Sequence, residues 1–270
     1  IHSGDWSSDV CSSDLFSIAG KTALITGGTS GIGLMIAEGY LRAGARIIVS
    51  SRKADACAAT QEALAEFGEV HAIPADVSRE DQCAELIDAV GAHTDKLDIL
   101  VNNAGATWGA PFDDFPTAAF DKILTLNVKA PFVLTQLARP LLEAASTGDD
   151  PARVINIGSI DGIVVPRMGT YSYSSSKAAV HQLTRHMAHA LAPTILVNAI
   201  APGPFPSKMM AATLDAVGDR LAAGTPVGRL GRGDDMAGAA IYLASRAANY
   251  VTGAVIPVDG GLSTTAGLSI

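Results

Sequence analysis

TGGTSGIG, at residues 26–33, joins an apolar run at 22–25 to a helical pattern at 31–43. Glycines between a buried strand and a helix let the backbone approach a ligand closely, and the free amides of the helix N-terminus favour a pyrophosphate. The glycine spacing differs from the general GxGxxG fingerprint, and no Lys-Ser/Thr follows the glycines to make a P-loop. Taken alone, the segment is as compatible with an ordinary tight turn as with a cofactor site.

Outward from this turn, apolar runs alternate with helical patterns. The apolar runs span 22–25, 46–50, 70–75, 97–101, 154–157, 195–200 and 254–258. The helical patterns span 31–43, 54–67, 81–93, 120–145 and 173–191. Runs such as LDILV have no polar face, which indicates strands buried on both sides of a parallel sheet with right-handed crossovers. We therefore predict an α/β fold: one Rossmann-type domain, with a doubly wound sheet of seven mainly parallel strands and helices on both faces.

Composition and charge narrow the class of protein. Of the 270 residues, 48% are hydrophobic and 17% are charged, which is enough for one large core. The net charge of −8 argues against nucleic acid as the main partner. No apolar stretch approaches the roughly 18 uncharged residues of a membrane helix, so we expect no membrane contact.

The first fifteen residues, IHSGDWSSDVCSSDL, are polar and aperiodic and lack the features of a secretory signal. We interpret 1–15 as a non-native or disordered tail and 16–270 as the single domain. Cys57 and Cys83 fall in helical patterns and are too few for a disulfide framework. They indicate buried free thiols and a cytoplasmic location.

Four motifs occur in a characteristic order: TGGTSGIG, NNAG at 102–105, YSSSK at 173–177, and Pro-Gly at 202–203. Together they resemble the short-chain dehydrogenase/reductase family, over residues 16 to about 265. The resemblance implies a nicotinamide-dependent oxidoreductase that needs no catalytic metal. It also implies a homodimer or homotetramer, in agreement with the apolar excess of the patterns at 120–145 and 173–191.

Tyr173 and Lys177 are four residues apart, so both side chains share one face of a helix. Tyr171, six residues from Lys177, points elsewhere. A nearby ammonium favours the phenolate, and a Tyr173 phenol can then exchange a proton with a carbonyl oxygen. The resemblance adds Ser159, as a hydrogen-bond donor to substrate, and Asn127, which holds a water beside the lysine. The catalytic set is therefore Asn127, Ser159, Tyr173 and Lys177.

Three histidines on the same helical pattern, His181, His186 and His189, suggest a metal site, but no carboxylate or cysteine clusters with them. We therefore expect no metal, and place these side chains on a solvated or oligomer-facing side of the helix.

The resemblance also identifies the residues expected to bind the coenzyme. They are Gly27, Thr29, Ser30, Gly31, Ile32, Gly33, Ser51, Arg52, Asp76, Val77, Asn103, Ala104, Gly105, Tyr173, Lys177, Pro202 and Gly203. An NAD-binding strand typically ends in an acid that binds the ribose 2′-hydroxyl, whereas this strand ends in Ser51-Arg52. Arg52 suits the 2′-phosphate of NADP(H), although it is also compatible with a solvated helix start. Asp76 either meets the adenine or caps a turn beside Ser78.

The substrate is the least determined feature. We expect the segments 167–173 and 202–210 to line its pocket, with Phe205, Met209 and Met210 as an adaptable apolar wall. The stretches YSYSSSKAAVHQLTR and APGPFPSKM resemble 3-oxoacyl reductases linked to rhamnolipid-type lipid synthesis. A 3-oxoacyl thioester is our first expectation. A sugar, polyol or alicyclic alcohol is the alternative, and a non-catalytic nicotinamide-binding regulatory protein is an alternative of a different class.

Overall fold

The computed structural model describes residues 12–166, 168–207 and 209–265 and contains one seven-stranded sheet. Its strands are β1 (Thr22–Thr26), β2 (Arg46–Ser51), β3 (Val70–Pro74), β4 (Ile99–Asn102), β5 (Ala152–Ile157), β6 (Ile195–Pro202) and β7 (Val255–Val258). The strand order is β3-β2-β1-β4-β5-β6-β7, and every neighbouring pair is parallel. All seven predicted strands are confirmed, within two residues at each end.

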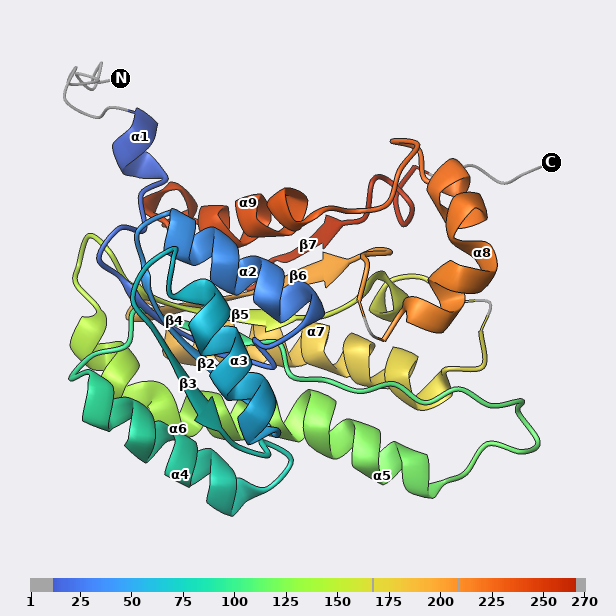
Figure 1. The fold of residues 1–270 in the computed structure, drawn as a ribbon, viewed down its shortest axis with the longest axis horizontal. Coiled ribbons are helices and arrows are strands. Elements are labelled where there is room, and N and C mark those ends of the chain that lie inside the picture. Colours follow the sequence, from blue (N-terminus) through green and yellow to red (C-terminus); the bar gives the residue numbers. More distant parts are fainter. Residues whose placement is uncertain (1–11, 167, 208, 266–270) are drawn as a thin grey trace.

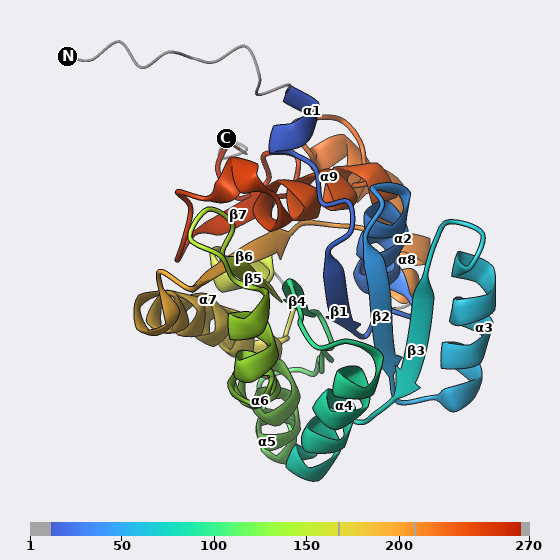
Figure 2. The same ribbon diagram turned by 90° about the vertical axis from the view of Figure 1, so that its left-hand side faces the viewer.

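Helices cover both faces of the sheet, as Figures 1 and 2 show. They are α1 (Ser12–Leu15), α2 (Gly31–Arg42), α3 (Ala54–Leu64), α4 (Glu80–His93), α5 (Ala118–Leu124), α6 (Ala130–Ala145), α7 (Tyr171–Leu191), α8 (Ala211–Gly224) and α9 (Gly233–Ala244). One layer contains α2, α3 and α9, and the other contains α4, α5, α6 and α7. Helix α8 lies beyond the carboxyl ends of β6 and β7 (Figure 1).

Two apolar cores follow from the strands having no polar face. Alternate residues of a strand point to opposite faces, so Ile25 joins the core under α2 and α9 while Leu24 joins the core over α4, α6 and α7. Both side chains are fully buried. The two cores hold the sheet rigid, which fixes the carboxyl ends of its strands relative to one another.

Three segments differ from the sequence prediction. The pattern at 120–145 is not one helix: a π-helical turn, Thr125–Lys129, separates α5 from α6. No helical pattern was predicted after residue 191, but that part of the chain contains α8 and α9. Residues 12–15 of the expected tail form the short helix α1, while 1–11 lie outside the described residues.

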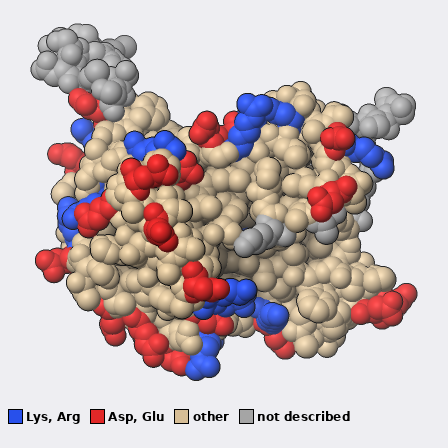
Figure 3. Space-filling model, viewed as in Figure 1, with Lys and Arg blue, Asp and Glu red and all other residues tan. Residues whose placement is uncertain are grey.

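On the face shown in Figure 3, the described residues show no gathering of charge of one sign. Lys and Arg side chains are interspersed with Asp and Glu over the face in Figure 3. Among the described helices, none combines the length and the apolar character that a membrane crossing requires. Among the described residues, Cys57 and Cys83 are both buried and form no disulfide, as predicted.

Candidate active site

A cavity of about 1060 Å³ lies at the carboxyl ends of the strands and extends from the turn after β1 to the first turns of α7. Open parallel sheets bind ligands at this edge, where the chain connections change direction on either side of β1. Of the predicted catalytic residues, Ser159, Tyr173 and Lys177 line the cavity. The predicted coenzyme residues that line it are Gly27, Thr29, Ser30, Gly31, Ile32, Ser51, Arg52, Asp76, Val77, Asn103, Ala104, Gly105, Tyr173, Lys177, Pro202 and Gly203.

The glycine-rich turn forms the floor of this cavity. Gly27 and Gly31 have φ values of 65° and 55°, which L residues with a Cβ rarely adopt. Gly33 was predicted to contact the coenzyme, but it does not line the cavity. A Cβ on Gly33 would lie 2.5 Å from the carbonyl oxygen of Gly27 and against the Asn103 amide, so its role is close packing behind the turn.

The turn after β4 is fastened directly to the glycine-rich turn. The Asn103 side-chain amide donates to the carbonyls of Thr26 at 2.9 Å and Gly27 at 3.1 Å. The Thr26 hydroxyl accepts from the backbone amides of Asn103 and Ala104, both at 3.1 Å. The two motifs TGGTSGIG and NNAG therefore act as one rigid unit.

The ends of β2 and β3 supply the polar side chains at the far end of the cavity. Arg52 follows β2 directly and is exposed along the cavity wall. Asp76 follows β3, and its Oδ1 accepts from the backbone amide of Ser78 at 3.1 Å and from the Ser78 hydroxyl at 2.7 Å. The turn-capping alternative for Asp76 is thus observed, while a contact with adenine stays a prediction.

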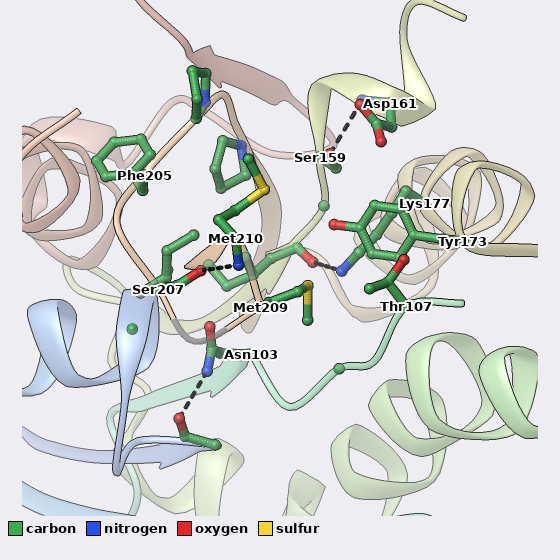
Figure 4. Close-up of a pocket in the computed structure, with 18 of the residues that line it drawn as sticks. Asn103, Thr107, Ser159, Asp161, Tyr173, Lys177, Phe205, Ser207, Met209 and Met210 are labelled. Atoms are coloured by element: carbon green, nitrogen blue, oxygen red, sulfur yellow. Dashed lines mark hydrogen bonds between the residues drawn. The ribbon is translucent and has the colours of Figure 1, made fainter. Parts of the chain in front are cut away.

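Tyr173 and Lys177 lie on one face of α7, as their spacing predicted. Figure 4 shows both side chains directed into the cavity. The Lys177 ammonium lies 5.4 Å from the centre of the Tyr173 ring and donates to the Ile157 carbonyl at 2.8 Å. Tyr171 points away, is 38% exposed and packs edge-on against Phe112.

Burial dominates the ionisation of this pair. It raises the pKa of Tyr173 to about 12, although interaction with the Ser159 hydroxyl lowers it. It lowers the pKa of Lys177 to about 8, against an opposing effect of Asp161. We expected the ammonium to favour the phenolate; in the chain by itself, loss of solvation of the phenolate prevails. Tyr173 is therefore a neutral proton donor at neutral pH.

Ser159 and Asn127, the other two residues of the predicted catalytic set, differ in their position relative to the cavity. Ser159 lies two residues after the end of β5, and its Oγ accepts from the backbone amide of Asp161 at 3.1 Å. Asn127 lies in the π-helical turn and does not line the cavity itself, so its role of holding a water beside Lys177 stays a prediction. Its amide donates to the Ala106 carbonyl and the Ser176 hydroxyl, both at 2.9 Å, because the wider turn directs this buried side chain inward.

The three histidines do not share one environment. His186 and His189 are exposed, as expected, but His181 is buried at 4% exposure. Its ring occupies the space that a Cβ on Gly158 or Gly162 would need. Burial and the Lys177 charge lower the pKa of His181 to about 4, so it is neutral at pH 7. No cluster suited to a metal ion occurs among the described residues.

The substrate side of the cavity is lined mainly by apolar side chains. Met209 and Met210 face Tyr173 across it. Phe205 also lines the cavity, farther from Tyr173 (Figure 4), and packs where a Cβ on Gly231 would lie. Two residues of the expected lining, Arg167 and Lys208, lie outside the described residues. Sequence reasoning missed the side chains of α8 and of the loop after β5. They are Asp161, Thr213, Val217, Arg220 and Leu221, whereas Met168 lines the cavity as expected.

This fold and site define a dinucleotide-dependent oxidoreductase: a parallel sheet, a glycine-rich turn beside its switch point, and a Tyr–Lys pair in the same cavity. A family model described as enoyl-(acyl carrier protein) reductase matches residues 27–263. The chain belongs to the short-chain dehydrogenase/reductase family.

Several relatives are similar over nearly their whole length. The rhamnolipids biosynthesis 3-oxoacyl-[acyl-carrier-protein] reductase of Pseudomonas aeruginosa is 48% identical, covering 91% of this chain and 97% of the relative. A solved Pseudomonas aeruginosa RhlG/NADP active-site complex is 46% identical, with a TM-score of 0.90 over 93% of this chain and 99% of that one. A gluconate 5-dehydrogenase from Burkholderia cenocepacia, solved with NADP and tartrate, is 34% identical, with a TM-score of 0.87 over 94% and 100%.

Proposed function

We propose that the protein interconverts a ketone and a secondary alcohol with NADP(H), and that its substrate is a 3-oxoacyl thioester. The observation that carries this proposal is the convergence of Ser159, Tyr173 and Lys177 on one wall of the cavity that extends to Arg52. A Tyr–Lys pair on the exposed face of a helix would not line a cavity. A site that only binds nucleotide would not need Ser159, Tyr173 and Lys177 on the same wall.

The residues present fit a nicotinamide coenzyme. The positive φ of Gly27 and Gly31 leaves space above the N-terminus of α2 for a pyrophosphate. Arg52 stands where β2 ends without an acid, and a guanidinium matches the 2′-phosphate. The NADP complexes among the relatives support the same choice. The bound coenzyme would supply the hydride that adds to the carbonyl carbon.

The protein residues would manage the proton and the oxygen. Tyr173, neutral because burial raises its pKa to about 12, donates its phenolic proton to the carbonyl oxygen. Ser159 already accepts a hydrogen bond from the Asp161 amide, so its own O–H can donate to the same oxygen. Asn127 acts indirectly, by holding the backbone at Ala106 and the hydroxyl of Ser176.

The apolar substrate side supports an acyl chain over a sugar. Met209 and Met210 are flexible thioether side chains that adapt to a hydrocarbon tail, and Val217 and Leu221 of α8 extend the same wall. The relative named as a 3-oxoacyl-[acyl-carrier-protein] reductase is 48% identical, against 34% for the gluconate 5-dehydrogenase from Burkholderia cenocepacia.

We also infer a homo-oligomer that acts in a reducing, cytoplasmic setting. Leu124 of α5 is 37% exposed and Phe132 of α6 is 45% exposed, so apolar side chains remain available for a second copy. The buried, unpaired Cys57 and Cys83 are compatible with the reducing setting. Light scattering at micromolar concentration tests the first inference, and a monomer would contradict it.

The activity is tested by following coenzyme oxidation with a panel of ketones. We expect NADPH consumption with 3-oxoacyl thioesters at a higher kcat/KM than with keto sugars or alicyclic ketones. Tight NADPH binding without turnover of any of these ketones would instead indicate a nicotinamide-binding regulatory protein.

A further inference from the structure

Asp161 is an acidic side chain at the reacting end of the cavity, and the mechanism above makes no use of its charge. It lies in the 3₁₀ turn Ile160–Gly162, two residues after Ser159, and lines the cavity while half-buried. Figure 4 shows it beside Ser159, on the same side as Tyr173 and Lys177. Within the described ranges, its carboxylate has no hydrogen-bond or ion-pair partner.

The charge of Asp161 reaches both members of the Tyr–Lys pair. It raises the pKa of Tyr173 and opposes the lowering of the pKa of Lys177. In return, the Lys177 ammonium favours the ionised carboxylate, although burial raises the pKa of Asp161. The neighbouring His181 is neutral at pH 7 and adds no charge there. The carboxylate is therefore close enough to act electrostatically on a substrate held by Ser159 and Tyr173.

Two like charges a few ångströms apart repel strongly where little water lies between them. A substrate with its own carboxylate next to the reacting ketone would bring such a charge to Asp161. A neutral ester or thioester at the same position would not, and a neutral donor on the substrate can donate a hydrogen bond to the carboxylate.

We propose that Asp161 is a specificity-determining residue that excludes 3-oxo acids and admits the neutral 3-oxoacyl esters and thioesters. The inference deepens the proposed function and rests on it, because it assumes that the ketone lies at Ser159 and Tyr173. Free 3-oxo acids share the acyl tail of the thioesters, so the apolar wall alone does not separate the two. The negative charge of Asp161 beside the ketone does distinguish the acids from the thioesters.

The substitution Asp161→Asn removes the charge and leaves the turn intact. The turn is held through the main chain of Asp161: its amide donates to Ser159 Oγ at 3.1 Å, and its carbonyl accepts from the Ser174 hydroxyl at 2.7 Å. Asp161→Glu retains the charge. Asp88→Asn, on the exposed side of α4, changes the net charge equally but far from the cavity.

The test compares 3-oxooctanoate with its ethyl ester. For each compound, kcat/KM is measured with NADPH, and the Kd of the enzyme–NADPH complex for it is measured by the change in NADPH fluorescence. We expect the wild type to prefer the ester by at least about tenfold in both quantities. The preference should fall by about tenfold in Asp161→Asn and persist in Asp161→Glu and Asp88→Asn.

An equal preference in the wild type and Asp161→Asn would overturn the assignment, as would a wild type that binds both compounds equally. Discrimination in Kd that depends on Asp161, without reduction of either compound, would support the role of Asp161. That same result would count against the proposed reductase activity, so the two ideas fail separately.

Discussion

Where the cavity meets β1 and β4, backbone groups and short side chains bind one another directly, as in the hydrogen bonds from Asn103 to Thr26 and Gly27. Where it meets the segment after β6 and helix α8, the wall consists mainly of apolar side chains, with Arg220 among them. Met209 is 45% exposed there, and Val217 interrupts the helix with a φ of −144°. We call these the coenzyme end and the substrate end. The structure of the coenzyme end depends on individual hydrogen-bonding atoms, whereas ligand binding at the substrate end depends on the overall size and polarity of the side chains.

The largest effect is expected where the two ends meet. Tyr173→Phe retains the ring and removes only the proton donor, so kcat should fall by about 10²–10⁴-fold while coenzyme binding persists. Steady-state kinetics and coenzyme titration measure the two quantities. Tyr171→Phe is the matched control, because its side chain packs against Phe112 outside the site, and it should change little. A reversed order would refute the assignment of Tyr173.

Adding a methyl group to each end tests the comparison directly. Gly33→Ala places a Cβ against the Gly27 carbonyl and the Asn103 amide, which should lower the free energy of unfolding by about 1–3 kcal/mol and weaken coenzyme binding. Gly218→Ala in α8 meets only Leu214, at 3.8 Å, and should stabilise by about 0.5–1 kcal/mol. Urea unfolding of the wild type and both variants measures these changes in the free energy of unfolding. Equal effects would show that the two ends are equally tightly built.

Coenzyme choice is the next effect in size. A charge-assisted hydrogen bond from Arg52 to a 2′-phosphate contributes about 1.5–3 kcal/mol, and exposure reduces it toward the lower value. The wild type should therefore favour NADPH over NADH by at least about tenfold in kcat/KM. Arg52→Asp should reverse the preference. If the wild type uses both coenzymes equally, Arg52 belongs to the solvated start of α3 instead.

The pH profile should show a smaller effect near neutrality. Lys177 loses its proton as pH rises through about 8, whereas Tyr173 keeps its proton until about 12. If the ammonium is needed, kcat/KM for ketone reduction should decline above pH 8, by about tenfold per unit at most. Asp161→Asn should move this decline to lower pH, because the Asp161 carboxylate raises the pKa of Lys177. A profile flat to pH 10 would exclude this role for Lys177.

The sequence predicted the coenzyme end well because its constraints are local. A strand without a polar face, followed by glycines and a helix, leaves few alternatives, and the spacing of Tyr173 and Lys177 fixes their common face. It could not show that Gly33 packs behind the turn, since that depends on Asn103, seventy residues away. The π-helical turn around Asn127 was also hidden, because its sequence continues a helical pattern.

The substrate end was predicted only in part because its signals are weak. The Pro/Gly-rich stretch at 203–232 gave no periodicity strong enough to show α8, so Val217, Arg220 and Leu221 were missed. Asp161 follows an ordinary strand end, and only the three-dimensional proximity to Lys177 gives it significance. Phe205 lines the cavity as expected, although its ring also packs where a Cβ on Gly231 would lie.

The transfer of deuterium from labelled NADPH to a 3-oxoacyl thioester tests the central claim most directly. NADPH carrying deuterium at the transferable position of the nicotinamide is incubated with the protein and the thioester, and the 3-hydroxyacyl product is analysed by mass spectrometry. The account predicts one deuterium at the new carbinol carbon with the wild type and almost no product with Tyr173→Phe. A wild type that leaves the thioester unreduced, or an unlabelled alcohol product, would contradict it.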